Sequence, residues 1–184
     1  MSSRGLSHCQ TNCVLNSNTV NVVYYSVYES PVGSLLLAGD SDALSLISFP
    51  EGKAARQPEP DWMRRNDAFK QVKNQLSAYF AGELKQFELP LAPVGTDFQL
   101  AVWRALETIP YGQTCSYGEI AAMIGNPDAS RAVGAANGQN PLPSVIPCHR
   151  VIGSDGSMTG FGGGVACKKF LLALEQEFTP FSLQ

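Results

Sequence analysis

Residues 116–138, with the sequence SYGEIAAMIGNPDASRAVGAANG, give the clearest indication of how the chain folds. Ser116 and Glu119 have the spacing of a capping box, in which each side chain satisfies a free backbone N–H at a helix start. Gly125 is suited to end that helix, and Pro127 is favoured at the first position of the next one. Two capped helices joined by so short a turn predict a helix-turn-helix.

Small side chains cover most of the second predicted helix. A helix that reads base edges in the major groove usually carries several Arg, Asn or Gln side chains, and here Arg131 is the only long cation. Two interpretations stay open at this point, which are tight packing against another helix and close approach to DNA. The small residues are Ala129, Ser130, Ala132, Gly134, Ala135 and Ala136.

Residues 140–152, NPLPSVIPCHRVI, follow directly. Three prolines fix the backbone repeatedly and predict a stiff, extended approach to Cys148. Apolar pairs on both sides indicate that Cys148, His149 and Arg150 are buried. A buried Arg150 needs a carboxylate or carbonyl partners, and Asn140 could brace the turn through hydrogen bonds.

Cys148 is a candidate nucleophile, because a cysteine thiolate is highly nucleophilic and His149 could accept its proton. Neighbouring residues on an extended chain point in opposite directions, so a bridging water or a third group would be needed. The alternative is an inert core cysteine, which the rigid Pro-Cys-His-Arg setting disfavours.

A glycine-rich loop at residues 153–164 lacks the Gly-Lys-Ser/Thr ending of a phosphate loop and could close over a flat ligand. Residues 165–178 then predict a helix. Glu175 lies near its apolar face, where it is either solvated or placed to orient His149. The side chains expected to face inward are Phe170, Leu171, Leu174 and Phe178.

Before the helix-turn-helix, Thr96 and Gln99 form a second capping-box pattern ahead of a helix that Pro110-Tyr111-Gly112 ends. Residues 91–95 resemble a linker. Earlier still, strands are predicted at 20–27, 35–38, 44–49 and 87–91, with a helix between Asp67, as its cap, and Gly82. We therefore expect an α/β (α+β) chain with a flexible tail at 1–19, a scaffold domain at 20–92 and a functional domain at 96–178.

Composition excludes several classes of protein. The chain has 184 residues, 44% of them apolar and 16% charged, so it is globular rather than disordered. Its net charge of −3 does not suggest a polyanion-binding surface. We find no membrane span and no secretion signal, and five cysteines are an odd number, so we expect reduced thiols in the cytosol.

The tail offers His8, Cys9 and Cys13 as possible metal ligands. A structural zinc ion needs four ligands, and the only other histidine is His149, so we expect no metal site.

Several of these motifs, in this order, resemble the O6-alkylguanine-DNA alkyltransferases. The resemblance is strong over about residues 96–176, and only the order of elements fits before that. It rests on Pro147-Cys148-His149-Arg150-Val151, Arg131-Ala132-Val133-Gly134-Ala135-Ala136, Asn140-Pro141, Tyr117 and Glu175.

The resemblance implies a ribonuclease-H-like β-sheet domain followed by a winged-helix-like domain that contains the helix-turn-helix. It also implies direct-reversal DNA repair, in which an alkyl group moves irreversibly from O6 of guanine, and also O4 of thymine, to Cys148. The partner would be double-stranded DNA contacted in the minor groove, which suits a smooth helix. We expect a monomer without a cofactor, in the cytoplasm or, in a eukaryote, the nucleus.

The resemblance also assigns roles. Cys148 would attack the alkyl carbon, His149 would act as base through a water, Glu175 would orient His149, and Asn140 would brace the turn. Tyr117 would donate a proton to guanine N3, with Lys168 supporting the developing charge, and Arg131 would replace the flipped base. DNA contacts would come from Tyr117, Arg131, Ala132, Ala135 and Ala136, and the pocket walls from Pro143, Val145, Met158, Phe161 and Gly162.

Three other functions remain as alternatives. A damage sensor that flips the base without reacting would lack Cys148. A cysteine hydrolase would need an oxyanion hole and would turn over. A sequence-specific regulator would need more base-reading side chains on the second helix.

Overall fold

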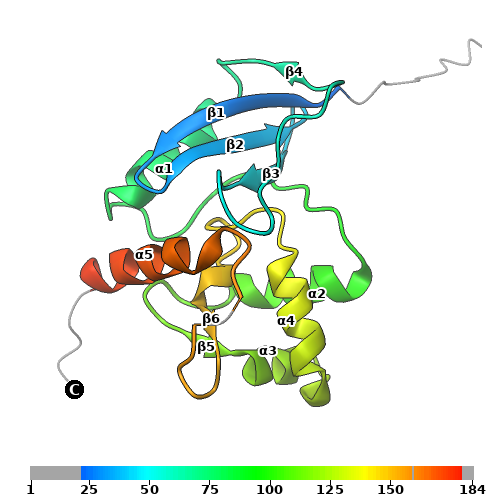
Figure 1. Cartoon of the computed structure of the whole chain (residues 1–184), viewed down its shortest axis with the longest axis vertical. Coiled ribbons are helices and arrows are strands. Elements are labelled where there is room, and N and C mark those ends of the chain that lie inside the picture. The colour runs from blue at the N-terminus through cyan, green and yellow to red at the C-terminus, as the bar shows by residue number, and fades with distance from the viewer. Residues whose placement is uncertain (1–21, 159, 180–184) are drawn as a thin grey trace, which may run out of the picture.

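The computed structural model describes residues 22–158 and 160–179 (Figure 1). Its N-terminal half contains the strands β1 (Tyr24–Ser30), β2 (Gly33–Gly39), β3 (Leu44–Ser48) and β4 (Met63–Arg64), followed by helix α1 (Lys70–Phe80). The sheet has the order β3-β2-β1-β4. The first three strands pair antiparallel, as the sequence predicts, and the two-residue strand β4 adds an unpredicted parallel edge beside β1.

The β1–β2 hairpin is fixed by its turn and by side-chain alternation. Ser30 Oγ donates to the carbonyl of Gly33 at 2.6 Å, and Gly33 adopts a φ of 99°, a conformation that favours glycine. Along β2, Leu35 and Leu37 enter the main core, while Leu36 and Ala38 belong to a smaller cluster with Val23, Tyr25 and Trp62. Both faces of β2 are therefore covered.

Two expectations for this half are wrong. Helix α1 begins after Phe69, whose φ is 59°, without a side-chain cap; Asp67 instead pairs with Arg65 on the surface. Residues 87–91 form no strand, and only Leu91 makes an isolated bridge, to Leu44. The start of the first predicted strand, and the predicted tail at 1–19, lie outside the described residues.

The C-terminal half contains α2 (Asp97–Glu107), α3 (Tyr117–Met123), α4 (Ser130–Gly138) and α5 (Gly164–Glu177), with short 3-10 turns at Pro127–Ala129 and Cys148–Arg150. Both predicted capping boxes form, with Thr96 and Gln99 at α2 and with Ser116 and Glu119 at α3. Helices α3 and α4 make the predicted helix-turn-helix, and Gly125 between them has a φ of 75°.

Other details of this half differ from expectation. The backbone at Cys148 is a 3-10 turn rather than an extended segment. Two-residue strands β5 (Cys115–Ser116) and β6 (Val151–Ile152) pair in parallel and were not predicted. Phe170 on α5 and Phe178 directly after it are exposed rather than inward-facing, while Leu171 and Leu174 are buried as expected.

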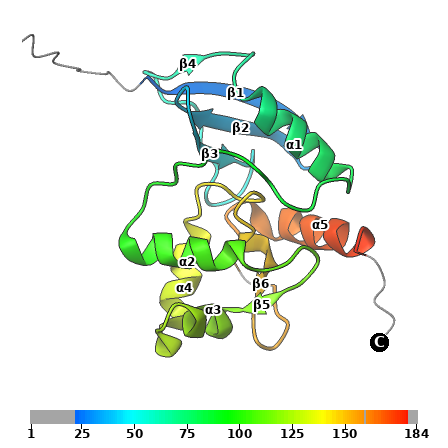
Figure 2. The same cartoon turned by 180° about the vertical axis from the view of Figure 1, so that it is seen from behind.

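The two halves share one continuous core. Figures 1 and 2 show the sheet stacked on the helical half, with α5 beneath it. The backbone N–H of Ile47 in β3 donates to the carbonyl of Pro141 at 2.8 Å, and that of Ala54 donates to the carbonyl of Gly162 at 3.1 Å. Within the described part of the chain, none of the helices has the length and apolar character needed to cross a membrane.

Candidate active site

Cys148 begins the 3-10 turn that precedes β6, and it is buried. Two asparagines hold the backbone around it. Asn137 Nδ2 donates to the Cys148 carbonyl at 3.2 Å, and Asn140 Nδ2 donates to the Ile146 carbonyl at 2.8 Å. Asn140 Oδ1 also accepts from the N–H of Leu142 at 3.0 Å, so one side chain closes the loop that carries Cys148.

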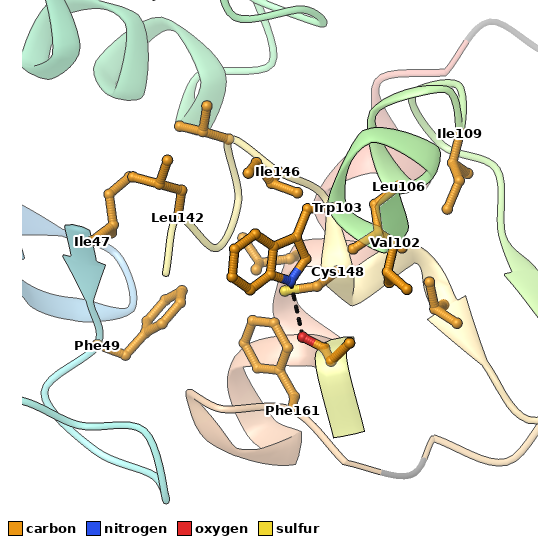
Figure 3. Close-up of a cluster of buried hydrophobic side chains, with 14 of the residues drawn as sticks. Ile47, Phe49, Val102, Trp103, Leu106, Ile109, Leu142, Ile146, Cys148 and Phe161 are labelled. Carbon is orange, nitrogen blue, oxygen red and sulfur yellow. Dashed lines mark hydrogen bonds between the residues drawn. The ribbon is translucent and has the colours of Figure 1, made fainter. Parts of the chain in front are cut away.

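A cavity of about 490 Å³ reaches Cys148 from the junction of the two halves. Pro143 and Gly162 line it from the C-terminal half, and Phe49 and Ala54 line it from the segment after β3. Figure 3 shows Cys148 beside the indole of Trp103, whose Nε1 donates to the Ala136 carbonyl at 2.9 Å. A small group can therefore approach the sulfur in an otherwise packed core.

The Cys148 thiol is held protonated at neutral pH. Burial raises its pKa to about 11, against the opposing effects of a hydrogen bond from Asn140 and the charge of Lys168. Because only the thiolate is a strong nucleophile, Cys148 needs a base at the moment of reaction.

His149, Arg150 and Glu175 form a buried network next to this thiol. His149 Nε2 lies 2.8 Å from Glu175 Oε1. Arg150 donates to both oxygens of Glu175, at 2.8 and 2.9 Å, and to the carbonyl of Ile109 at 2.6 Å. Helix α5 thus places the carboxylate against a turn in which two consecutive residues contact it.

The protonation states in this network follow from its contacts. Burial favours the neutral form of Glu175, but hydrogen bonds from His149 and Arg150 outweigh it and hold the pKa of Glu175 far below its usual range. Burial also lowers the pKa of His149, against the opposing pull of Glu175. A neutral His149 beside an ionised carboxylate carries its proton on Nε2, so Nδ1 is left as the acceptor. Within residues 22–158 and 160–179, this buried Nδ1 has no hydrogen-bond partner.

Lys168 is fully buried on α5, about two helical turns before Glu175. Its Nζ donates to the carbonyl of Val151 at 2.6 Å. Burial lowers its pKa, and attraction to Cys148 opposes that shift. Lys168 is therefore a cation held close enough to Cys148 to favour a negative sulfur.

Tyr117 and Arg131 lie on another surface, around the helix-turn-helix. They share a shallow depression with Gly134, Ser154 and Gly160, and the Tyr117 ring packs near Gly134. Arg131, Ala132 and Ala135 are exposed on α4. Ala136 is buried instead, because its side of the helix faces Trp103, so it is not part of the exposed face.

Of the five residues predicted to line the substrate pocket, two line the cavity at Cys148. Pro143 and Gly162 line the cavity at Cys148. Val145 lines a separate pocket beside Arg150. The ring of Phe161 packs edge-on against that of Phe49, with 5.5 Å between the ring centroids, and Met158 is exposed.

Sequence reasoning missed two side chains of this site. Tyr79 on α1 donates to Glu175 Oε1 at 2.8 Å, and Asn137 holds the Cys148 carbonyl. In the sequence, Tyr79 has the spacing of a buried aromatic residue on an amphipathic helix, so nothing distinguishes it from a residue that only packs in the core. Asn137 carried a usable signal, because an amide on the buried side of an alanine-rich helix needs a partner.

No cluster of three or more potential metal ligands occurs in the described part of the chain. His8, Cys9 and Cys13 lie outside the described residues. Cys115, Cys148 and Cys167 are free thiols.

Comparison with known proteins gives two matching family models. The 6-O-methylguanine DNA methyltransferase ribonuclease-like domain matches residues 23–93, and the DNA-binding domain of the same family matches residues 97–177. Among curated relatives, the methylated-DNA–protein-cysteine methyltransferase of Methanosarcina acetivorans is 52% identical over 153 residues, which are 83% of this chain and 98% of that protein. Its Mycobacterium tuberculosis counterpart is 48% identical over 162 residues, covering 88% and 98% of the two chains.

A solved structure agrees in fold. The crystal structure of Mycobacterium tuberculosis OGT in complex with DNA has a TM-score of 0.80 and 49% identity, covering 85% of this chain and 95% of that one. The ribonuclease-like sheet domain and the helical DNA-binding domain expected from the sequence are confirmed. From the matched models and these relatives together, the chain belongs to the 6-O-methylguanine DNA methyltransferase family.

Proposed function

We propose that this chain repairs DNA by transferring the alkyl group on O6 of guanine to the sulfur of Cys148. One observation carries the assignment to this residue: a buried thiol lies at a cavity, next to a histidine whose free nitrogen is Nδ1 and whose other nitrogen is tied to Glu175. Family membership supplies the reaction class, since relatives about 50% identical are named methylated-DNA–protein-cysteine methyltransferases.

The first step is loss of the thiol proton. Nδ1 of His149 is the acceptor, and a water between it and Sγ carries the proton, because the two side chains are not hydrogen-bonded directly. Glu175 stabilises the imidazolium that results. Lys168 and Asn140 lower the cost of the sulfur charge, as their effects on the Cys148 pKa indicate.

The thiolate then attacks the alkyl carbon in line with the C–O6 bond. A sulfur–carbon bond forms, the carbon–oxygen bond breaks, and its electron pair goes to guanine. We assign the proton that guanine takes up at N3 to Tyr117, which lines the depression at the helix-turn-helix rather than the cavity at Cys148, so the flipped base must extend from one to the other. Lys168 supports the charge that develops. The thioether is not hydrolysed, so each molecule reacts once. O4 of thymine offers the same leaving-group chemistry.

Binding of the base needs it to leave the double helix. We assign the minor-groove surface to α4, where Ala132 and Ala135 allow the backbone close to DNA and Arg131 can fill the position of the flipped base. Backbone groups at Val145 and Cys148 would hold the guanine edge, and Pro143 and Gly162 would flank the alkyl group.

Residues 97–184 contain five basic and seven acidic side chains. The DNA phosphates must therefore be bound mainly by backbone N–H groups, hydroxyls and helix N-termini. Affinity for DNA should then be modest, independent of sequence and weakly dependent on salt. We assign the active form to a monomer in a reducing compartment that holds DNA, in keeping with three free thiols among the described residues.

The proposal is tested by measuring how many methyl groups each protein molecule takes up. The protein is mixed with a duplex containing one O6-methylguanine labelled in its methyl group, and protein-bound label is followed over time. One label per protein, none on Cys148→Ala, and slow transfer by His149→Gln are expected. Continued release of labelled product with unmodified protein would overturn the proposal.

A further inference from the structure

We infer that Tyr79, on helix α1 of the ribonuclease-like domain, is a positioning residue for alkyl transfer, and that it acts by holding the Glu175 carboxylate against His149. The inference rests on the proposed function, because the group that Tyr79 positions matters only if His149 is the base. It gives the N-terminal half a part in the reaction beyond that of a scaffold.

The Tyr79 hydroxyl contacts the Glu175 carboxylate directly, in a part of the core that is closed to solvent. Tyr79 Oη donates to Glu175 Oε1 at 2.8 Å and lies 3.5 Å from His149 Nε2. Tyr79, His149 and Glu175 are each 0% exposed. Burial, followed by the nearby charge of Glu175, raises the pKa of Tyr79 well above its usual value, so the hydroxyl keeps its proton and acts as a donor.

The five hydrogen bonds to the Glu175 carboxylate explain why this donor matters. Oε2 accepts from Arg150 Nε at 2.8 Å and from the Gly112 N–H at 3.0 Å. Oε1 accepts from Arg150 Nη2 at 2.9 Å, from His149 and from Tyr79. Tyr79 is the one of these donors that belongs to the N-terminal half. Its bond draws charge from the oxygen that faces His149 and fixes the direction of that oxygen.

The Tyr79 ring is held independently of its hydroxyl. It packs against Phe80, Phe87 and Tyr111 at centroid distances of 5.4, 5.2 and 6.1 Å. Tyr79→Phe should therefore keep the packing and remove only the hydrogen bond. With one donor fewer, Oε1 becomes a stronger acceptor for His149, and the pKa of His149 rises.

Two effects of Tyr79→Phe are expected. The rate constant for methyl transfer at neutral pH should fall about ten-fold, the usual scale for losing a partner that orients a functional group. The acidic limb of the rate–pH profile should move to higher pH, because protonated His149 cannot act as base. A merely structural role would not move that limb.

The chain offers a matched control in Tyr111. Its hydroxyl is buried and has no partner among the described residues, and its ring lies over Arg150. Tyr111→Phe removes a neighbouring hydroxyl of the same kind and should leave the transfer rate and the pH profile unchanged. A second probe, 3-fluorotyrosine at position 79, keeps the ring and strengthens the donor, so the acidic limb should move to lower pH.

The measurement is single-turnover methyl transfer from an O6-methylguanine duplex between pH 5 and 9, with duplex affinity measured alongside. Opposite shifts for Tyr79→Phe and 3-fluorotyrosine, with unchanged duplex affinity, support the inference. An unshifted acidic limb in 3-fluorotyrosine protein overturns it, whether or not Tyr79→Phe folds. Failure of the unaltered protein to transfer methyl would instead overturn the proposed function.

Discussion

Arg150 binds Glu175 through two parallel hydrogen bonds, Nε to Oε2 at 2.8 Å and Nη2 to Oε1 at 2.9 Å. Both side chains are buried, and the remaining nitrogen of Arg150 donates to the carbonyl of Ile109. The paired geometry offsets the cost of burying two charges. It also leaves Glu175 ionised, which is the state that fixes the tautomer of His149.

Replacing Arg150 with methionine should destabilise the protein strongly. Glu175 would remain buried without its counter-charge, and breaking such a pair typically costs about 3–5 kcal/mol of unfolding free energy. Urea denaturation would measure the loss. Arg104→Met, at an exposed position on α2, is the control and should change stability by less than about 0.5 kcal/mol. Equal effects of the two substitutions would show that the buried pair does not contribute as described.

Stability should fall with acid in two stages. The folded-state pKa of both His149 and Glu175 lies below the ordinary value, so the unfolded chain takes up protons first as the pH falls. The free energy of unfolding should start to decrease below about pH 6.5, from His149, and decrease further below about pH 4.5, from Glu175. Urea midpoints across this range measure both stages, and His149→Gln should remove the first. A midpoint that rises between pH 7 and 5 would contradict the assigned protonation states.

Arg131→Ala should separate base flipping from chemistry. If Arg131 fills the position of the extruded base, transfer from duplex DNA should slow by about ten-fold or more, since unstacking a base costs a few kcal/mol. Reaction with the free O6-methylguanine base needs no flipping and should keep its rate. Arg104→Ala serves as the charge-matched control. Equal slowing of both reactions by Arg131→Ala would place its effect on the reaction step instead.

Gly52→Ala should loosen the loop that covers the cavity. Gly52 has a φ of 105°, and a Cβ there would clash with the carbonyl oxygen of Gly162. Gly125→Ala isolates the conformational cost of about 1–2 kcal/mol, because its Cβ would meet nothing within 4 Å. Gly52→Ala should lower the free energy of unfolding by about 1–3 kcal/mol more than Gly125→Ala, because its Cβ clashes with the backbone. Thermal unfolding of the pair measures the difference, and equal losses would mean that the Gly52–Gly162 contact is unimportant.

Local signals were predictable from the sequence, because they depend on residues a few positions apart. The capping boxes at Thr96 and Ser116 and the turn at Gly125 form as expected. The apolar pairs on both sides of Cys148, His149 and Arg150 correctly indicated that these residues are buried, although the backbone there is a 3-10 turn rather than the extended segment that the prolines predicted.

Contacts between distant segments could not be predicted in the same way. The β5–β6 pair joins residues 115–116 to 151–152, and β4 has only two residues, too few for a periodic pattern. Tyr79 meets Glu175 across 96 positions of sequence. On α1 it has the spacing of a core residue, and only the packed structure shows that its hydroxyl points at a carboxylate.

Alkyl transfer to Cys148 is tested most directly by the mass of the protein after reaction with a duplex that carries one O6-methylguanine, followed by peptide mapping. We expect one methyl group per molecule, located on Cys148 and absent from Cys115 and Cys167, with no modification of Cys148→Ala. Methylation at another cysteine, or folded protein that binds the duplex and gains no mass, would contradict it.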